Sequence, residues 1–221
     1  MNIITKININ IREKLNPYLG PLRQKKLLPE NREFTIIAND CWAGHVYRYF
    51  YLPYDSPTIG TGFFAEDYVK FVTNLKEYLE MDMKMIKAKE SKHYNEIMKQ
   101  NSQFHNCPYA RIGDVELRFG HYKDPDEALE KWNKRKKRIH WDNLIIKMSE
   151  HNECTLDLLQ TFDALPYKKK VLFTTRDYGL KSQIIYKEYL GKGDIKNNTA
   201  HFRKYVNLIN LVNGLPFKIN Q

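Results

Sequence analysis

Apolar residues along this chain occur in two alternating patterns, as short continuous runs and as residues spaced three and four apart. The run at 34–38, FTIIA, is rich in β-branched residues and is bounded by polar side chains. Such runs are typical of strands buried on both faces of a parallel sheet. In 115–119 the apolar residues alternate with Glu116 and Arg118, which predicts a strand with one exposed face. Further strands are predicted at 83–86, 143–148, 171–174 and 183–186.

Helical spacing fills the intervals between these runs. The clearest boundary is at Asp124, which supplies an N-cap ahead of Pro125 and of two acidic residues in the first turn. Gly214 and Pro216 end the last predicted helix. Helices are predicted at 44–51, 66–79, 91–100, 125–139, 155–165 and 201–213.

Strands and helices that alternate in this way favour right-handed βαβ units. We therefore expect an α/β fold of three layers, in which a mainly parallel sheet is covered by helices on both faces. Residues 34–221 are predicted to form this single domain. Residues 1–33 are predicted to be a helical, basic N-terminal lead-in that Pro17, Gly20, Pro21 and Pro29 interrupt.

The composition is that of a folded protein with a basic surface. Hydrophobic residues make up 42% of the 221 residues, which excludes a disordered chain. The formal net charge of +10 attracts anions, and we expect an anionic small-molecule substrate such as a sugar nucleotide or a lipid-linked sugar. Nucleic acid is not expected as a partner, because no recognised motif accompanies the charge and the basic residues are not interleaved with aromatic platforms.

Cysteine usage and hydropathy indicate the cellular compartment. Three cysteines without a CxxC pair predict neither a disulfide framework nor a zinc site, which fits a reducing compartment. The first twenty residues mix isoleucine with charged residues and lack the apolar core of a signal peptide. No stretch approaches the roughly 18 consecutive apolar residues of a spanning helix. We expect a cytoplasmic protein whose membrane contact, if any, is peripheral and at the inner face.

The residues that directly follow the predicted strands are rich in polar and titratable groups. Ligands of open α/β sheets bind at the carboxyl ends of the strands, so these groups are expected to converge on one crevice. They comprise Asn39, Asp40 and Cys41 after the first strand, His121 and Tyr122 after the central one, and Ser149, Glu150, His151 and Arg176 after the later ones.

Within that crevice, Cys41 and His121 form the candidate nucleophile and base. A thiol at the start of a helix has a lowered pKa, which favours the thiolate. Asn39 or a backbone N–H group would then donate to an oxyanion. The alternative is that Cys41 is a small buried packing residue and His121 a structural histidine.

The predicted helix at 125–139 carries a basic stripe of Lys131, Arg135 and Arg138. A stripe of this kind suits a diphosphate, because guanidinium groups bind phosphate oxygens through paired hydrogen bonds. The alternative is a solvated face whose basic end suits the helix dipole without any ligand. Beyond the helix, Trp141 is predicted either to stack on a sugar ring or to pack within the protein.

The chain lacks the short motifs that would identify a cofactor or a metal. Neither GxGxxG nor GxxxxGK[ST] occurs, so dinucleotide and Walker-type ATP sites are not expected. The absence of GxSxG weakens a serine hydrolase. The seven histidines show no HExxH spacing, so no metal site is predicted, and the cofactor is unknown at this point.

Three long segments of the chain are rich in less common residues. They read FTIIANDCWAGHVYRYFYLPYDSPTIGTGFFAEDYVKF, HYKDPDEALEKWNKRKKRIHWDN and FDALPYKKKVLFTT, and they lie between about Phe34 and about Thr175. These segments resemble successive blocks of the bacterial family usually described as exopolysaccharide biosynthesis protein, itself a domain of unknown function. The resemblance covers most of the chain.

The first block of that family reads like Asn-Asn-Cys-Trp-Gly-Gly, and this chain departs from it at Asp40 and Ala43. An acidic Asp40 raises the pKa of a neighbouring thiol, which counts against a reactive Cys41 thiolate. The resemblance implies further site candidates, of which the polar and basic ones are expected to contact ligand, while Pro57, Gly60 and Trp132 shape the backbone or the core. The full set is Ser56, Pro57, Thr58, Gly60, Asp67, Tyr68, Lys70, His121, Tyr122, Trp132, Arg135, Arg138, Trp141, Asp142 and Asn143.

The resemblance implies a place in the biosynthesis of capsule, exopolysaccharide or lipopolysaccharide, and it leaves the reaction open. One hypothesis is a transferase acting on an activated sugar or glycan precursor, with the basic stripe on pyrophosphate and Asp40, Asp114 or His121 near the reacting sugar. A second is a Cys41-dependent acyltransferase that decorates a glycan. A third is a non-catalytic binding protein of the same pathway.

Overall fold

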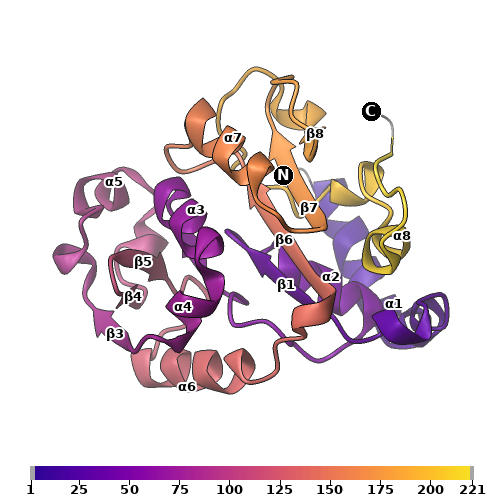
Figure 1. Ribbon diagram of the computed structural model, residues 1–221, viewed down its shortest axis with the longest axis horizontal. Coiled ribbons are helices and arrows are strands. Elements are labelled where there is room, and N and C mark those ends of the chain that lie inside the picture. The colour runs from indigo at the N-terminus through magenta and orange to yellow at the C-terminus, as the bar shows by residue number, and fades with distance from the viewer. Residues whose placement is uncertain (1–2, 220–221) are drawn as a thin grey trace.

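The computed structural model describes residues 3–219 and contains two four-stranded sheets that lie next to each other (Figure 1). The first is parallel, with the strand order β1 (Thr35–Ala38), β6 (Leu144–Ser149), β7 (Lys169–Thr174) and β8 (Gln183–Ile185). The second is antiparallel, with the order β2 (Gly62–Phe63), β5 (Val115–Arg118), β4 (Tyr109–Ile112) and β3 (Met83–Ile86). The expected α/β class and parallel sheet are confirmed, but the sheet is not the only one, and half of these strands are antiparallel.

A two-residue turn accounts for the antiparallel sheet. Gly113 and Asp114 join β4 to β5, and Ile112 pairs directly with Val115 across the turn. Gly113 has φ of 56°, a backbone conformation that tight hairpin turns require and that glycine adopts without strain. A hairpin with this turn cannot belong to a βαβ unit, so the segment between β1 and β6 folds as a separate sheet.

Helices surround both sheets, and their bounds follow the hydrophobic pattern closely in most places. Two predicted helices are each interrupted: 66–79 divides at Asn74, and 201–213 divides into a short 3₁₀ turn, Phe202–Lys204, and a final helix. The α-helices are α1 (Ile3–Gln24), α2 (Trp42–Phe50), α3 (Ala65–Thr73), α4 (Leu75–Glu80), α5 (Tyr94–Lys99), α6 (Pro125–Lys136), α7 (Leu156–Ala164) and α8 (Leu208–Asn213).

Within the N-terminal lead-in, residues 3–24 form one helix, α1, so the interruptions expected at Pro17, Gly20 and Pro21 are wrong. The break expected at Pro29 is found, because α1 has ended by then and Pro29 begins a separate 3₁₀ turn, Pro29–Asn31. Pro17 and Pro21 are four residues apart, so both missing N–H donors lie on one side of the helix. Gly20 lies where α1 packs on α2, because a Cβ at this position would be 2.8 Å from the carbonyl oxygen of Phe50. Arg23 and Gln24 then donate to the carbonyls of Tyr49 and Phe50, at 2.6 and 2.7 Å. No helix within residues 3–219 is long and apolar enough to cross a bilayer.

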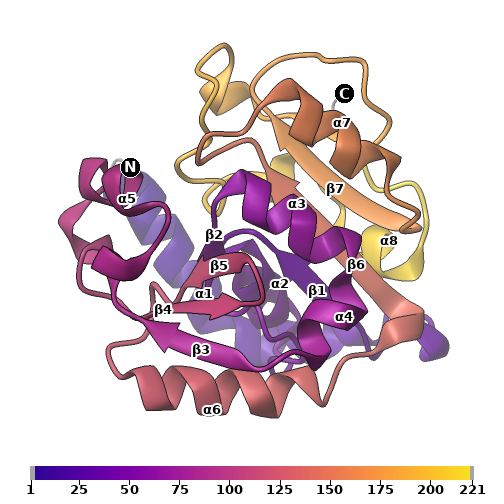
Figure 2. The ribbon, with the colours of Figure 1, turned by 60° about the vertical axis from the view of Figure 1, so that its left-hand side comes forward.

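The parallel sheet has a hydrophobic cluster on each face. On one face, Trp42 of α2 and Leu211 of α8 pack against Phe173 and its neighbours. On the other, α3, α7 and the antiparallel sheet share a cluster that also buries Trp132 of α6, which runs alongside β3 (Figure 2). The prediction that one face of the strand at 115–119 is exposed is wrong at Glu116. This side chain is only 2% exposed and accepts hydrogen bonds from Arg111.

Tyr68 joins the two halves of the structure. Its side chain extends from α3 and is fully buried, and its hydroxyl lies 2.8 Å from the carbonyl of Ile37 and 2.7 Å from that of Lys147. These carbonyls belong to β1 and β6, two adjacent strands that end at the site described below. The hydroxyl therefore fixes α3, and with it the antiparallel sheet, against the parallel sheet.

Replacing Tyr68 with Phe should lower the free energy of unfolding by about 1–2 kcal/mol, because a buried hydrogen bond is lost while the ring still fills its space. Urea denaturation followed by circular dichroism measures this. The matched control is Tyr18→Phe, because Tyr18 is 76% exposed on α1 and its substitution should leave the free energy unchanged. Equal effects of the two substitutions would contradict the role assigned to Tyr68.

Candidate functional site

A cleft of about 930 Å³ opens where the two sheets meet. The turn after β1 contributes Asp40 and Cys41, the segment after β6 contributes His151, and the C-terminal part of the chain contributes Asn198. The antiparallel sheet contributes Arg118 at the end of β5 and, just beyond, His121. The cleft thus lies at the carboxyl edge of the parallel sheet, as expected for an open α/β sheet.

Cys41 and His121 are in direct contact across this seam. The Cys41 Sγ atom lies 2.9 Å from Nε2 of His121, and both residues line the cleft. Gly60 makes the approach of the second segment feasible. It has φ of 78°, and a Cβ there would be 2.9 Å from the Tyr122 ring and 3.4 Å from the His121 Cβ. The predicted pairing of a thiol with an imidazole is therefore found in the structure.

The resting state of this pair is a neutral thiol. Burial, with the Asp40 carboxylate as the next largest cause, raises the pKa of Cys41 to about 11. The expectation that the helix N-terminus would lower this pKa is wrong, and the opposing effect of Asp40 is confirmed. The neutral thiol lies within hydrogen-bond distance of Nε2 of His121, which is the geometry of a thiol and its candidate base.

A buried ion pair lies directly beneath Cys41. Lys147 of β6 is fully buried, and its ammonium group donates to Oδ2 of Asp40 and, at 2.6 Å, to Oγ of Ser149. Asn198 donates to the same two oxygens at 2.6 Å each. The other carboxylate oxygen, Oδ1, accepts the backbone N–H of Trp42 at 3.0 Å, which anchors the first turn of α2.

The charges of this pair follow from their environment. Burial raises the pKa of Asp40, but Lys147 and His151 together lower it by more, to about 2. Burial lowers the pKa of Lys147 to about 8, against the opposing effect of Asp40. A carboxylate with this pKa and these partners is a weak base, so Asp40 is suited to orienting Cys41 rather than to removing a proton itself.

Two further histidines and an arginine complete the wall of the cleft. Burial lowers the pKa of His151, and its Nε2 atom has no hydrogen-bond partner among residues 3–219, although Asp40 Oδ2 lies 3.9 Å away. Burial, and after it the positive charge of Arg48, lower the pKa of His45 to about 4. Both imidazoles are therefore neutral at pH 7. Arg118 is held by Gln100 at 2.6 Å and lies over the Phe104 ring at 4.0 Å.

Three predicted binding residues support the site from beneath and do not reach the cleft. Asn39 is fully buried and exchanges two 3.0 Å hydrogen bonds with the backbone of Ser149, so it ties the ends of β1 and β6 together. Ser56 and Thr58 are also fully buried, and Thr58 accepts the backbone N–H of Ala38 at 3.1 Å. The prediction of ligand contact is corrected for these residues, because their polar atoms are used within the protein.

The basic stripe of α6 holds a loop of the protein itself. Arg135 donates to the carbonyl of Ile59 at 3.2 Å and to the hydroxyl of Tyr122 at 2.7 Å. Arg138 donates to the carbonyl of Tyr54 at 2.6 Å and pairs with Asp55 at 3.2 Å. The phosphate-binding role predicted for these two arginines, and the ligand contact predicted for Tyr122, are corrected, since none of them lines the cleft.

The remaining predicted residues lie elsewhere. Trp141, Asp142 and Asn143 precede β6 and are therefore at the amino edge of the parallel sheet, opposite the cleft. Arg176 follows β7 but is exposed and approaches only the Tyr178 ring, at 6.0 Å. Asp114 lies in the hairpin turn. Trp141, Asp142 and Asn143 are therefore remote because they precede a strand rather than follow one, and Asp114 because it belongs to the other sheet.

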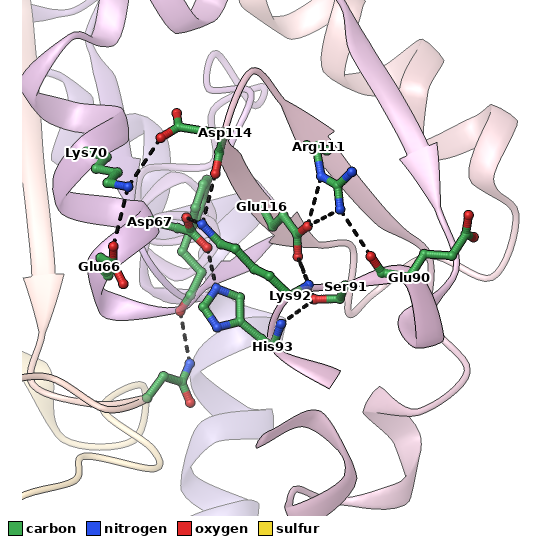
Figure 3. Close-up of polar contacts among 12 residues, drawn as sticks. Glu66, Asp67, Lys70, Glu90, Ser91, Lys92, His93, Arg111, Asp114 and Glu116 are labelled. Atoms are coloured by element: carbon green, nitrogen blue, oxygen red, sulfur yellow. Dashed lines mark hydrogen bonds and ion pairs between the residues drawn. The ribbon is translucent and has the colours of Figure 1, made fainter. Parts of the chain in front are cut away.

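A second polar cluster lies on the antiparallel sheet and is self-contained (Figure 3). Asp67 is fully buried and accepts hydrogen bonds from Lys92 at 2.5 Å and from His93 at 2.6 Å. Lys70 bridges Glu66 and Asp114, at 3.3 and 3.2 Å. These contacts satisfy the charges of the cluster, so Asp67 and Lys70 stabilise the sheet, as Tyr68 does, rather than joining the cleft.

The family model "Domain of unknown function (DUF1919)" matches residues 11–215 of this chain. The chain belongs to the DUF1919 family. An uncharacterized protein of Haemophilus influenzae is 28% identical over 178 residues, which cover 80% of this chain and 78% of that protein. The resemblance to a domain of unknown function is thus confirmed. The DUF1919 match spans every residue named in the cleft, from Asp40 to Asn198.

Sequence reasoning missed Lys147, Arg118 and Asn198 of this DUF1919 chain. A lysine within the apolar run LIIKM is a signal of a buried charge, and it would have pointed to Asp40 as the partner. Asn198 lies in a polar segment without any comparable signal. Across residues 3–219 no group of three or more His, Cys, Asp or Glu side chains is arranged to hold a metal ion.

Asp40→Asn should remove a part of the stability that depends on pH. The pKa of Asp40 is depressed to about 2 from 3.8, so its contribution is complete above the higher value and is lost as the pH falls through the lower one. The substitution should cost about 3 kcal/mol at pH 7, because Lys147 loses its buried partner. Urea denaturation between pH 2 and pH 7 should show this cost shrinking toward the acid end, whereas exposed Asp142→Asn should cost nothing measurable at any pH.

Alkylation of Cys41 by iodoacetamide should be slow at pH 7 and should rise about tenfold per pH unit toward pH 10, because only the thiolate reacts. Peptide mass spectrometry separates Cys41 from Cys107 and Cys154, and Cys41→Ser gives the background. A fast rate that stays constant from pH 6 upward would indicate a preformed thiolate and contradict the raised pKa.

Proposed function

We propose that this protein is a cysteine-dependent acyltransferase that modifies a glycan precursor in the biosynthesis of a surface polysaccharide. The observation that carries the proposal is the 2.9 Å contact between Cys41 Sγ and His121 Nε2 inside a cleft of about 930 Å³. A nucleophile in hydrogen-bond reach of its base, open to a cavity that accommodates a substrate, is the arrangement that acyl transfer requires.

The reaction follows from the protonation states. His121 takes the thiol proton as Cys41 Sγ attacks the carbonyl carbon of an activated acyl donor such as a thioester. The bond to the leaving group breaks, the leaving thiolate takes the proton from His121, and the acyl group stays on Cys41. A hydroxyl of the glycan then attacks the acyl-enzyme while His121 accepts its proton, the bond between Sγ and the acyl carbon breaks, and the released Cys41 thiolate takes that proton from His121.

Arg118 is the group best placed to stabilise the charge that develops during both steps. Among the cations near Cys41 it has the largest lowering effect on the thiol pKa. Its contacts with Gln100 and Phe104 hold the guanidinium in a fixed place, so little reorganisation is needed when negative charge appears. Asn152 also lines this part of the cleft and anchors to the carbonyl of Phe63 at 3.0 Å.

Acyl transfer accounts for the site better than sugar transfer does. The sugar-transfer hypothesis placed Asp40, Asp114 or His121 near the reacting sugar, but Asp40 is committed to Lys147, Asn198 and the N–H of Trp42. Asp114 is bonded to Tyr78 and Lys70 in the hairpin turn. The glycan acceptor and the cytoplasmic location belong to the proposal and rest on the family resemblance.

The proposal is tested with p-nitrophenyl acetate as a general acyl donor. The wild-type protein should release a burst of p-nitrophenol, and intact-protein and peptide mass spectrometry should find one acetyl group on Cys41. Cys41→Ala should abolish both signals. His121→Gln should slow acylation about 10²–10⁴-fold at pH 7, the usual contribution of a general base.

The control is the double variant Cys107→Ser/Cys154→Ser, which leaves Cys41 as the remaining thiol of the chain and should behave as wild type. Circular dichroism confirms that each variant is folded. Acetylation that persists on another residue in Cys41→Ala, with an unchanged burst, would refute the cysteine mechanism.

A further inference from the structure

A second, smaller pocket adjoins the cleft where α1, α2 and the 3₁₀ turn Phe202–Lys204 meet. Its volume is about 40 Å³, and one water molecule needs roughly 10–15 Å³, so it has room for a group of phosphate size and not for a sugar ring. Arginines from all three elements line it: Arg12 from α1, Arg48 from α2 and Arg203 from the 3₁₀ turn.

The positive charge of this pocket is only partly balanced. Glu13 lies 3.3 Å from Arg48 and is the acidic residue that lines the pocket. Within residues 3–219, neither Arg12 nor Arg203 has a carboxylate at ion-pair distance; Arg203 instead lies over the Tyr49 ring at 5.5 Å. Arg23 covers the same ring at 4.0 Å, so a further guanidinium lies close by.

Crowding of these cations has an energetic cost. Burial and then repulsion by Arg12 lower the pKa of Arg203, against a smaller opposing effect of Tyr49. Guanidinium groups held together without an anion are under strain that a bound anion relieves, and arginine is the side chain that binds phosphate oxygens in pairs. The exposed side chains of Arg12 and Arg48 can still turn toward such a ligand.

The arginine pocket is continuous with the Cys41 cleft, because His45 and Thr199 line both. Arg48 also contributes to the pKa of Cys41, and Arg203 to that of His45, so the two sites are within electrostatic range. A substrate with a phosphate group at one end and its reacting group at the other can therefore occupy both at once.

We propose that Arg12, Arg48 and Arg203 form a phosphate subsite that binds the phosphate or diphosphate of the substrate while its reacting end lies at Cys41. The second half of this inference rests on the proposed acyl transfer, whereas the anion binding itself does not. The two arginines of the α6 stripe, for which a diphosphate was expected, are bonded to the protein, so this pocket replaces the stripe as the proposed phosphate site.

Two sources of a diphosphate fit the surroundings. A soluble nucleotide-linked molecule fits through the open cleft. A lipid-borne diphosphate also fits, because α1 exposes Ile11, Leu15 and Tyr18 next to Arg12, at 52%, 44% and 76% exposure. The chemistry at the arginines is the same for both.

Isothermal titration calorimetry of the full chain with inorganic pyrophosphate tests the subsite. Arg12→Gln/Arg203→Gln should weaken pyrophosphate binding at least tenfold, and Arg203→Lys should recover part of it. The matched control, Arg32→Gln/Lys134→Gln, removes the same charge from exposed positions outside the pocket and should bind as wild type. Equal losses in the two double variants, or no binding to the wild type, would overturn the subsite.

Further arms identify the source and separate this proposal from the first one. Binding is measured for UDP-glucose and for phosphatidylcholine vesicles that carry a polyprenyl diphosphate, with plain phosphatidylcholine vesicles as the blank. The source of the diphosphate is the ligand that binds the wild-type protein and binds more weakly to Arg12→Gln/Arg203→Gln. Cys41→Ala should keep wild-type affinity for pyrophosphate. If Cys41 is never acylated but pyrophosphate still binds at the arginines, the acyl-transfer proposal fails and the subsite stands. If Cys41 is acylated but pyrophosphate does not bind at the arginines, the subsite fails and the acyl-transfer proposal stands.

Discussion

The ion pair between Lys147 and Asp40 is the interaction on which the site depends. An ammonium group on a fully buried strand position is unstable without a partner, so the chain after β1 must turn to bring Asp40 to it. The same carboxylate caps the N–H of Trp42 and so fixes where α2 begins. Cys41 lies between these two residues, and its orientation toward the cleft follows from theirs.

The second requirement is that two different sheets hold the two residues of the thiol–imidazole pair. Cys41 belongs to the parallel sheet and His121 to the antiparallel one, so their contact depends on the docking of one sheet against the other. Tyr68 and Asn39 supply polar contacts along this seam, together with the N–H of Phe63, which donates to the Asn39 carbonyl at 3.2 Å. A change at the seam would therefore alter the distance between thiol and imidazole without touching either.

The hydrophobic pattern predicted most of the elements because their burial is periodic. It failed at β2, which has two residues, and at β4, which contains Arg111 and whose pairing with β5 is set by the Gly113 turn rather than by periodicity. Cys41 and His121 were found because they directly follow strands. Arg135, Arg138 and Asn143 were misplaced, because a polar residue that bonds to a distant carbonyl has the same sequence signature as one that binds a ligand.

The separation of the ion-pair residues along the sequence affects when the pair can form during synthesis of the chain. Asp40 and Lys147 are 107 residues apart, and Asp40 and Asn198 are 158 apart. The Gly113 hairpin, by contrast, joins neighbours and closes early, since short loops lose little entropy on closure. A growing chain therefore carries Asp40 in water until most of the protein has left the ribosome. The cleft is completed only when the segment that carries Asn198 has been made, because Asn198 lines it and holds Asp40 in place.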